Sequence, residues 1–185
     1  MKEYKFRASQ STLSTWVRGD IDRAIEGYFK LADYCTPQME MGRKFHKEWE
    51  LEVKKTSCMP KVFGGKKIEN FKTERKIVRQ ITPWMELVGV IDLSINSKLL
   101  IDFKTGKTPS SSYTNSFQHK LYQILIPTAE RFEYHHWDQY KKKADMNIIH
   151  LTEKTLDDGL NYLLTYGAEM HSYLIENGLY EKYQK

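Results

Sequence analysis

Two stretches of apolar residues near the middle of the chain predict a β-hairpin. They run from Leu87 to Ile95 and from Leu99 to Phe103, with the polar residues 96–98 between them. Runs rich in Leu, Val and Ile on either side of a short polar turn are typical of paired antiparallel strands. Further strands are predicted over 71–81, 132–137 and 146–151.

Apolar residues at helical spacing predict the remaining elements. Thr36 and Pro37 are typical of an N-cap and a first-turn proline, and the helix that they open should continue to Lys54. Its residues that are expected to face the core recur every four positions: Met41, Phe45, Trp49 and Val53. The other expected helices cover about 13–17, 21–31, 115–125 and 155–176. This pattern predicts an α/β fold, in which helices flank both faces of a small mixed sheet.

The predicted hairpin carries a carboxylate on each strand, Asp92 and Asp102, and Lys104 follows the second by two residues. Because side chains alternate between the faces of a strand, Asp102 and Lys104 should point the same way about 7 Å apart. A three-residue turn pairs Ile95 with Leu99 and places Asp92 opposite Asp102. A two-residue turn would instead send the two carboxylates to opposite faces. The first register predicts that both carboxylates and the ammonium converge on one patch.

Such a patch has two interpretations. One is an internal ion pair between Lys104 and one aspartate, which would leave the other carboxylate uncompensated at a real cost. The other is a site for a hard divalent cation, which binds oxygen ligands and accounts for both carboxylates. We favour the metal site.

Four short motifs around the hairpin resemble those of the RecB-like branch of the PD-(D/E)XK nuclease superfamily. Residues 89–92 read GVID and match a GxxD motif, and residues 101–106 read IDFKTG and match DxKTG. Upstream, residues 42–46 match a GxxxH helix motif, and downstream, residues 118–122 match QxxxY. Each motif is weak alone, but the four occur in the family's order. The resemblance implies a restriction-endonuclease-like core.

The resemblance also implies a set of metal ligands. Asp92 and Asp102 would bind Mg²⁺ or Mn²⁺, helped by His46 and the main-chain carbonyl of Phe103. Without the resemblance, His46 would be interpreted as a residue at the edge of the core. Glu50, one helical turn after His46, is a weaker candidate that would act through a water.

Three further matching residues have implied catalytic roles. Lys104 would orient or help to deprotonate the attacking water and would stabilise charge on the phosphate. Gln118 and Tyr122 are four residues apart and share one face of a helix, from which they would position Lys104 or the scissile phosphate. Periodicity alone would predict an exposed Gln118 and a packed Tyr122.

The chain departs from many RecB-like relatives in its cysteines. Those relatives carry a four-cysteine iron–sulfur cluster, but this chain has only Cys35 and Cys58, which are far apart in the sequence. We therefore expect Mg²⁺ or Mn²⁺ and no iron–sulfur cluster.

The net charge of +5 is unevenly distributed. Residues 43–79 contain twelve Lys or Arg against five Asp or Glu, whereas residues 151–185 contain three against six. A solvated surface would explain a basic segment by itself, but beside a metal site it favours a phosphate backbone as the partner. The candidate DNA contacts are four basic residues and two rings that could stack on bases or pack in the core: Arg43, Lys44, Lys47, Lys107, Tyr113 and Phe117.

The length of 185 residues predicts one domain. We divide it into N-terminal helices (1–35), a catalytic core (36–151) and a C-terminal helix (152–185). No stretch approaches the ~20 apolar residues of a membrane span, and the N-terminus lacks the apolar region of a signal peptide. We expect a cytoplasmic protein of a cell, or of a cell infected by a phage or virus, with no membrane partner.

These features predict a metal-dependent DNA nuclease, an exonuclease that acts on single-stranded DNA or on DNA ends in repair or recombination. A recombination or replication protein is a candidate partner. The alternatives are a structure-specific endonuclease, a non-catalytic nucleic-acid-binding module on the same fold, and a small-phosphate hydrolase. The complete Asp, Asp, Lys set argues against the binding module, and the basic surface argues against the small-phosphate hydrolase.

Overall fold

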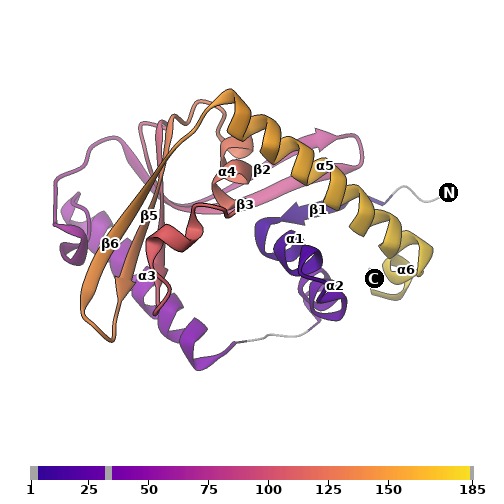
Figure 1. Ribbon diagram of the computed structural model, residues 1–185, viewed down its shortest axis with the longest axis horizontal. Coiled ribbons are helices and arrows are strands. Elements are labelled where there is room, and N and C mark those ends of the chain that lie inside the picture. Colours follow the sequence, from indigo (N-terminus) through magenta and orange to yellow (C-terminus); the bar gives the residue numbers. More distant parts are fainter. Residues whose placement is uncertain (1–3, 32–34, 184–185) are drawn as a thin grey trace.

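The computed structural model describes residues 4–31 and 35–183, which form a mixed six-stranded sheet with helices on both faces (Figure 1). The predicted fold class is therefore confirmed. The strands are β1 (Phe6–Ser9), β2 (Phe71–Thr82), β3 (Met85–Ile95), β4 (Leu99–Thr105), β5 (Arg131–Asp138) and β6 (Lys143–His150). The α-helices are α1 (Gln10–Val17), α2 (Ile21–Phe29), α3 (Pro37–Thr56), α4 (Gln118–Leu125), α5 (Glu153–Glu176) and α6 (Leu179–Tyr183). Two short 3-10 helices are η1 (Lys61–Phe63) and η2 (Ser110–Tyr113).

The central hairpin has the register that the three-residue turn predicts. Its Cα pairs run from Ile95 with Leu99 to Leu93 with Ile101. Asn96 and Ser97 form the turn with φ values of 53° and 57°, a left-handed conformation that asparagine tolerates better than most residues. The turn chemistry therefore fixes the alignment of β3 with β4.

Strand β3 pairs with three other strands, β1, β2 and β4. Along one edge it pairs with β2 over most of its length. Its other edge pairs with β1 over 85–88 and with β4 over 93–95, so residues 89–92 have no strand partner there in the described chain. This gap, between the ends of β1 and β4, contains the GxxD segment.

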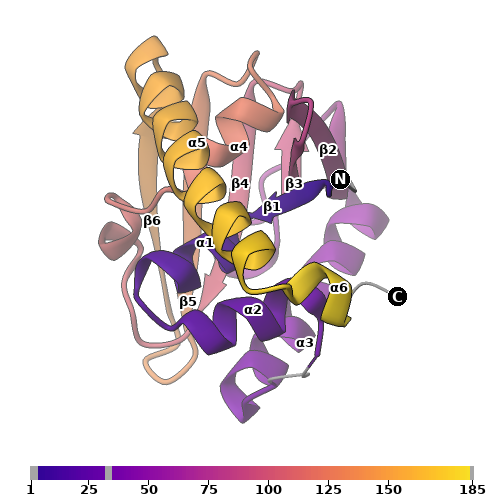
Figure 2. The same ribbon diagram turned by 90° about the vertical axis from the view of Figure 1, so that its right-hand side faces the viewer.

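The two faces of the sheet are covered by different helices, as Figures 1 and 2 show from two directions. On one face, α1, α2, α4, α5 and α6 bury the larger core, to which β4 contributes Leu100. On the other, α3 buries a smaller core through Trp49 and Val53, which pack with Ile101 and Phe103 of β4. Alternation along β4 thus supplies both cores and sends Asp102 to the side of α4.

Helix α3 packs only through its second half. Thr36 caps it by accepting a hydrogen bond from the Met39 amide, and Pro37 occupies the first turn, as predicted. Trp49 is buried, but Met41 is 44% exposed, so the prediction that Met41 faces the core is wrong. The periodicity is correct, but the first turns of the helix border an open cleft instead of the sheet.

Several elements differ from the sequence prediction, among them the unpredicted short helix α6, strand β1 and the start of α4. Strand β1 was missed, because four residues with one exposed arginine carry no distinctive pattern, and its partner β3 is distant in the sequence. Helix α4 begins at Gln118, since η2 and a turn occupy the residues before it. Within the described residues, no helix is long and apolar enough to span a bilayer.

Candidate active site

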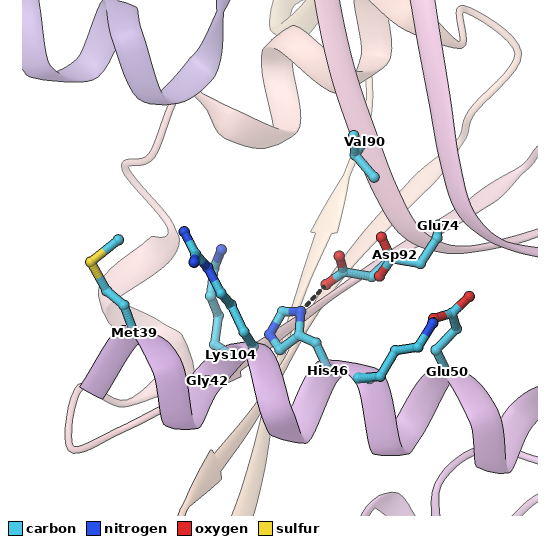
Figure 3. Close-up of a pocket in the computed structure, with 10 residues that line it drawn as sticks. Met39, Gly42, His46, Glu50, Glu74, Val90, Asp92 and Lys104 are labelled. Carbon is cyan, nitrogen blue, oxygen red and sulfur yellow. Dashed lines mark hydrogen bonds and ion pairs between the residues drawn. The ribbon is translucent and has the colours of Figure 1, made fainter. Parts of the chain in front are cut away.

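A cleft of about 900 Å³ lies between the N-terminal half of α3 and the strands β2, β3 and β4 (Figure 3). Residues of the GxxxH, GxxD and DxK motifs, which are separated in the sequence, line this cleft. Its walls are formed by Met39, Gly42, Arg43, His46, Lys47, Glu50, Glu74, Val90, Asp92 and Lys104.

His46 and Asp92 face one another across this cleft (Figure 3). The His46 Nδ1 atom lies 3.4 Å from Asp92 Oδ2, which also accepts a hydrogen bond of 2.8 Å from the Phe103 amide. Burial by itself would lower the pKa of His46, but the hydrogen bond and charge of Asp92 outweigh burial and raise that pKa. The Phe103 bond ties Asp92 to β4 at the point where the β3–β4 ladder has ended.

Glu74 of β2 completes a group that sequence reasoning missed. One ligand atom each from His46, Glu74 and Asp92 lie within 4.8 Å of one another, so these residues could hold a metal ion. The sequence did contain a signal, because Glu74 is the only acidic residue between positions 70 and 85, among Lys and Arg residues. Its approach to Asp92 depends on β2 lying beside β3.

Asp102 and Lys104 form a second, buried group with Gln118 of α4. The Lys104 Nζ atom lies 2.7 Å from Asp102 Oδ2 and donates a hydrogen bond of 3.0 Å to Gln118 Oε1. Gln118 Nε2 donates to Asp102 Oδ1, which closes the network. Asp102 is only 4% exposed, and Gln118 is also buried. Gln118, which periodicity alone would leave exposed, is therefore buried beside Lys104.

Electrostatics in this network keep Lys104 cationic. Burial by itself would lower the pKa of Lys104, but the charge of Asp102 raises the pKa above its usual value. Burial raises the pKa of Asp102, and the opposing charge of Lys104 does not reverse this shift. The Asp92 charge also contributes to raising the pKa of Asp102, so the two motif aspartates influence one another electrostatically.

Tyr122 holds the GxxD segment in place from α4. Its hydroxyl donates a hydrogen bond of 2.7 Å to the carbonyl of Val90, in the stretch of β3 that lacks a strand partner on this side. A Cβ at Gly89 would lie 2.5 Å from Leu125 Cδ1, so the absence of a side chain at Gly89 lets α4 approach β3 closely. Tyr122 therefore contacts the backbone near Asp92 rather than Lys104.

The predicted DNA contacts are distributed over several places. Arg43 and Lys47 line the cleft, and Lys47 pairs with the buried Glu50 at 2.8 Å. Glu50 also pairs with Lys54, so lysines hold the carboxylate that we considered as a water-mediated ligand. Lys44 is exposed on α3 and is not among the cleft-lining residues.

The two aromatic candidates lie on the other side of Lys104. Tyr113 and Phe117 line a second cavity of about 550 Å³, and Lys104 and Gln118, which also form the network with Asp102, contribute to its wall. The Phe117 ring already stacks on Tyr162, with centroids 3.8 Å apart.

Lys107 lies outside both cavities, with its Nζ 4.9 Å from the centroid of the Tyr140 ring. It lines a smaller pocket together with His136 and Asp145.

Comparisons with known proteins reveal similarity of structure but not of sequence. No family model matches the chain, and no curated protein matches it in sequence. Among solved structures, a phage-related exonuclease from Haemophilus somnus 129PT has a TM-score of 0.62 at 11% identity, over 94% of this chain and 97% of that one. The alkaline exonuclease LHK-Exo from Laribacter hongkongensis has a TM-score of 0.57 at 9% identity, over 94% and 93%. A proposed exonuclease from Eubacterium rectale has a TM-score of 0.64 at 14% identity, over 95% and 82%. The chain therefore shares its fold with these exonucleases, which agrees with the restriction-endonuclease-like core predicted from the sequence.

Proposed function

We propose that this protein is a metal-dependent deoxyribonuclease that removes nucleotides from single-stranded DNA or from DNA ends. One observation carries the proposal: Lys104, held by Asp102 and Gln118, reaches the wall of the same cleft in which His46 faces Asp92. Hydrolysis of a phosphodiester needs a positively charged side chain next to residues of the types that bind metal ions. The exonuclease names of the structural neighbours support the substrate class, and LHK-Exo was solved in complex with dAMP.

The residues of the cleft suit a divalent cation. His46 Nδ1 and the Asp92 carboxylate are close together and open to the cleft, and Asp102 and the carbonyl of Phe103 are the further ligands that the motifs imply. A bound Mg²⁺ or Mn²⁺ would supply Lewis-acid polarisation of the phosphate and a more acidic water. The mixed nitrogen and oxygen donors are compatible with Mn²⁺ as well as Mg²⁺.

Lys104 acts as a cation in this proposal. Its raised pKa keeps the ammonium protonated, so Lys104 donates to a phosphate oxygen or orients the attacking water and does not accept its proton in this state. Asp102 balances the charge, and Gln118 fixes the direction in which the ammonium points. Two groups, one from β4 and one from α4, thereby preorganise one donor.

The basic side of α3 supports a polyanionic substrate. Arg43 and Lys47 lie in the cleft wall, and Lys44 is exposed on the same helix. The cavity beyond Lys104, with Tyr113 and Phe117 in its wall, offers space for a nucleotide next to the scissile phosphate. A small-phosphate hydrolase would need neither feature.

A substrate panel tests the proposal. The protein is incubated with labelled single-stranded oligonucleotide, linear duplex, covalently closed plasmid and p-nitrophenyl phosphate, each with Mg²⁺, Mn²⁺ or EDTA. We expect progressive release of mononucleotides from linear DNA, an intact closed circle and no reaction in EDTA. Lys104→Met, which keeps the length of the side chain without its charge, should bind DNA and not cleave it.

Each rival function gives a different result in this panel. Cutting of closed circles or of branched DNA away from ends would identify an endonuclease. DNA binding without cleavage under any metal condition would identify a binding module. Hydrolysis of p-nitrophenyl phosphate without digestion of DNA would identify a small-phosphate hydrolase.

A further inference from the structure

Glu74 has a backbone conformation that is unusual for its place in the fold. It lies inside β2, yet its φ is +48°, in the left-handed region that non-glycine residues rarely adopt. The Cα pairs on either side, Thr73 with Leu93 and Arg75 with Ile91, keep one register, and the position opposite Asp92 is not paired in the ladder. The strand is therefore distorted at the single residue that faces Asp92, and such distortions cluster at functional sites.

In the described part of the chain, the Glu74 carboxylate forms no ion pair, although the charges of His46 and Lys47 act on it at longer range. Among the described residues, no lysine or arginine lies within ion-pair distance of it. The negative charges of Asp92 and Glu50 lie near it as well. Glu74 is exposed to the cleft, so an ion from solvent can reach it. The structure thus holds two carboxylates close together without an intervening lysine or arginine.

Asp102 is in a different situation, although it belongs to the same site. Its Oδ1 accepts a hydrogen bond from Gln118, and its Oδ2 lies 2.7 Å from the Lys104 Nζ atom but accepts no hydrogen bond within the described residues. Asp92 instead turns to His46, from α3, and to Glu74, from β2 (Figure 3). The ligand atoms that lie together in the cleft wall are therefore those of His46, Glu74 and Asp92.

We propose that Glu74 is a metal ligand, and that with His46 and Asp92 it forms a cation site centred on the β2–β3 side of the cleft. The ion is a divalent cation that accepts one imidazole nitrogen and two carboxylates, for which Mn²⁺ is well suited. The left-handed backbone at Glu74 turns its side chain to this site. The inference rests on the proposed function for the identity of the cleft, but it concerns ion binding and can be tested without cleavage.

Binding of Mn²⁺ to the full chain tests the assignment. Isothermal titration and the shift in melting temperature with Mn²⁺ are measured for wild type, Glu74→Gln and the control Glu69→Gln. Glu69 lies two residues before the same strand, is 76% exposed at its side chain and pairs with Lys67 at 3.9 Å. Ca²⁺ replaces Mn²⁺ in a second series, because it binds oxygen-rich sites.

We expect Glu74→Gln to weaken Mn²⁺ binding by at least about tenfold, since even residues that only support metal ligands typically contribute that much. The melting temperature of Glu74→Gln without metal should equal or exceed that of wild type, because a like charge beside Asp92 is removed. Its rise on addition of Mn²⁺ should be smaller than in wild type. Glu69→Gln should match wild type in all three measurements.

Unchanged Mn²⁺ affinity in folded Glu74→Gln would overturn the assignment. If that variant does not fold, Glu74→Asn replaces it, because asparagine tolerates the left-handed conformation. Wild type that binds Mn²⁺ through Glu74 but digests no DNA would refute the proposed function and leave the ion site standing. If wild type digests DNA but Glu74→Gln binds Mn²⁺ with unchanged affinity, the assignment of Glu74 as a ligand is refuted and the proposed function stands. Absence of any Mn²⁺ or Ca²⁺ binding in wild type would overturn both.

Discussion

Replacing Gln118 by leucine tests the buried network that holds Lys104. The substitution keeps most of the side-chain volume and removes two hydrogen bonds, the one donated to Asp102 and the one accepted from Lys104. Both partners are ionised, and each such bond contributes about 1.5–3 kcal/mol. The buried apolar surface of leucine offsets part of the stability lost with these hydrogen bonds. We therefore expect the free energy of unfolding to fall by about 2–4 kcal/mol.

The same helix offers a matched control. Gln123 is also buried in α4, but it donates to the carbonyl of Thr152 and accepts from the hydroxyl of Thr155, which are neutral groups. Neutral hydrogen bonds contribute about 0.5–1.5 kcal/mol each, so Gln123→Leu should cost about 1–3 kcal/mol. It should leave Lys104 and its activity unaffected.

Urea unfolding and steady-state DNA cleavage separate the two variants. For Gln118→Leu we expect kcat to fall by about tenfold to a hundredfold, because a misplaced catalytic group costs that much. Gln123→Leu should retain the kcat of wild type. If folded Gln118→Leu cleaves with the kcat of wild type, the network does not position Lys104, and the role we give to Gln118 is wrong.

Four further outcomes follow from the structure. Asp102→Asn should abolish cleavage and retain DNA binding in gel-shift assays; cleavage at the wild-type rate with Mg²⁺ would contradict the metal assignment. Cleavage should be faster with Mn²⁺ than with Mg²⁺, and His46→Ala should raise the Mn²⁺ concentration for half-maximal rate, with partial rescue by excess Mn²⁺. Burial lowers the pKa of His119 from 6.5 to about 4, so its contribution to stability is complete above the unfolded-state value and is lost as the pH falls. The loss should be about 2 kcal/mol between pH 7 and pH 5, measured by urea unfolding, and His119→Gln should flatten that dependence. Gly89→Ala should cost about 1–3 kcal/mol by the same assay, since its Cβ would overlap Leu125; a loss below about 0.5 kcal/mol would mean that α4 moves freely.

Local chemistry made much of the fold predictable. The residues Asn96 to Lys98 favour a three-residue turn, and this turn fixed the register of β3 and β4 because each added residue would shift the alignment by one. Thr36 and Pro37 marked the start of α3 for an equally local reason, since they satisfy the first turn of a helix. Such features depend on neighbours in the sequence and need no knowledge of the rest of the chain.

The order of the motifs also predicted most of the candidate site. His46, Asp92 and Lys104 line one cleft, and Gln118 joins Lys104 through a hydrogen bond. These residues could be identified because the motifs have fixed spacings within single helices or strands. Lys107 follows the DxK motif closely, yet its direction was not predictable, and it lies in a different pocket.

The features that depend on pairing between strands distant in the sequence were decided by the tertiary structure alone. The pairing of β1 with β3 joins residues about eighty positions apart, and four residues are too few for the alternation of buried and exposed side chains in β1 to be recognised. That pairing stops before Gly89 and leaves the gap that α4 fills through Tyr122. The part played by Glu74 depends on β2 lying beside β3 and on one left-handed residue, neither of which periodicity encodes. A sequence specifies which side chains a strand carries, but the packing of distant segments decides which of them share a cleft.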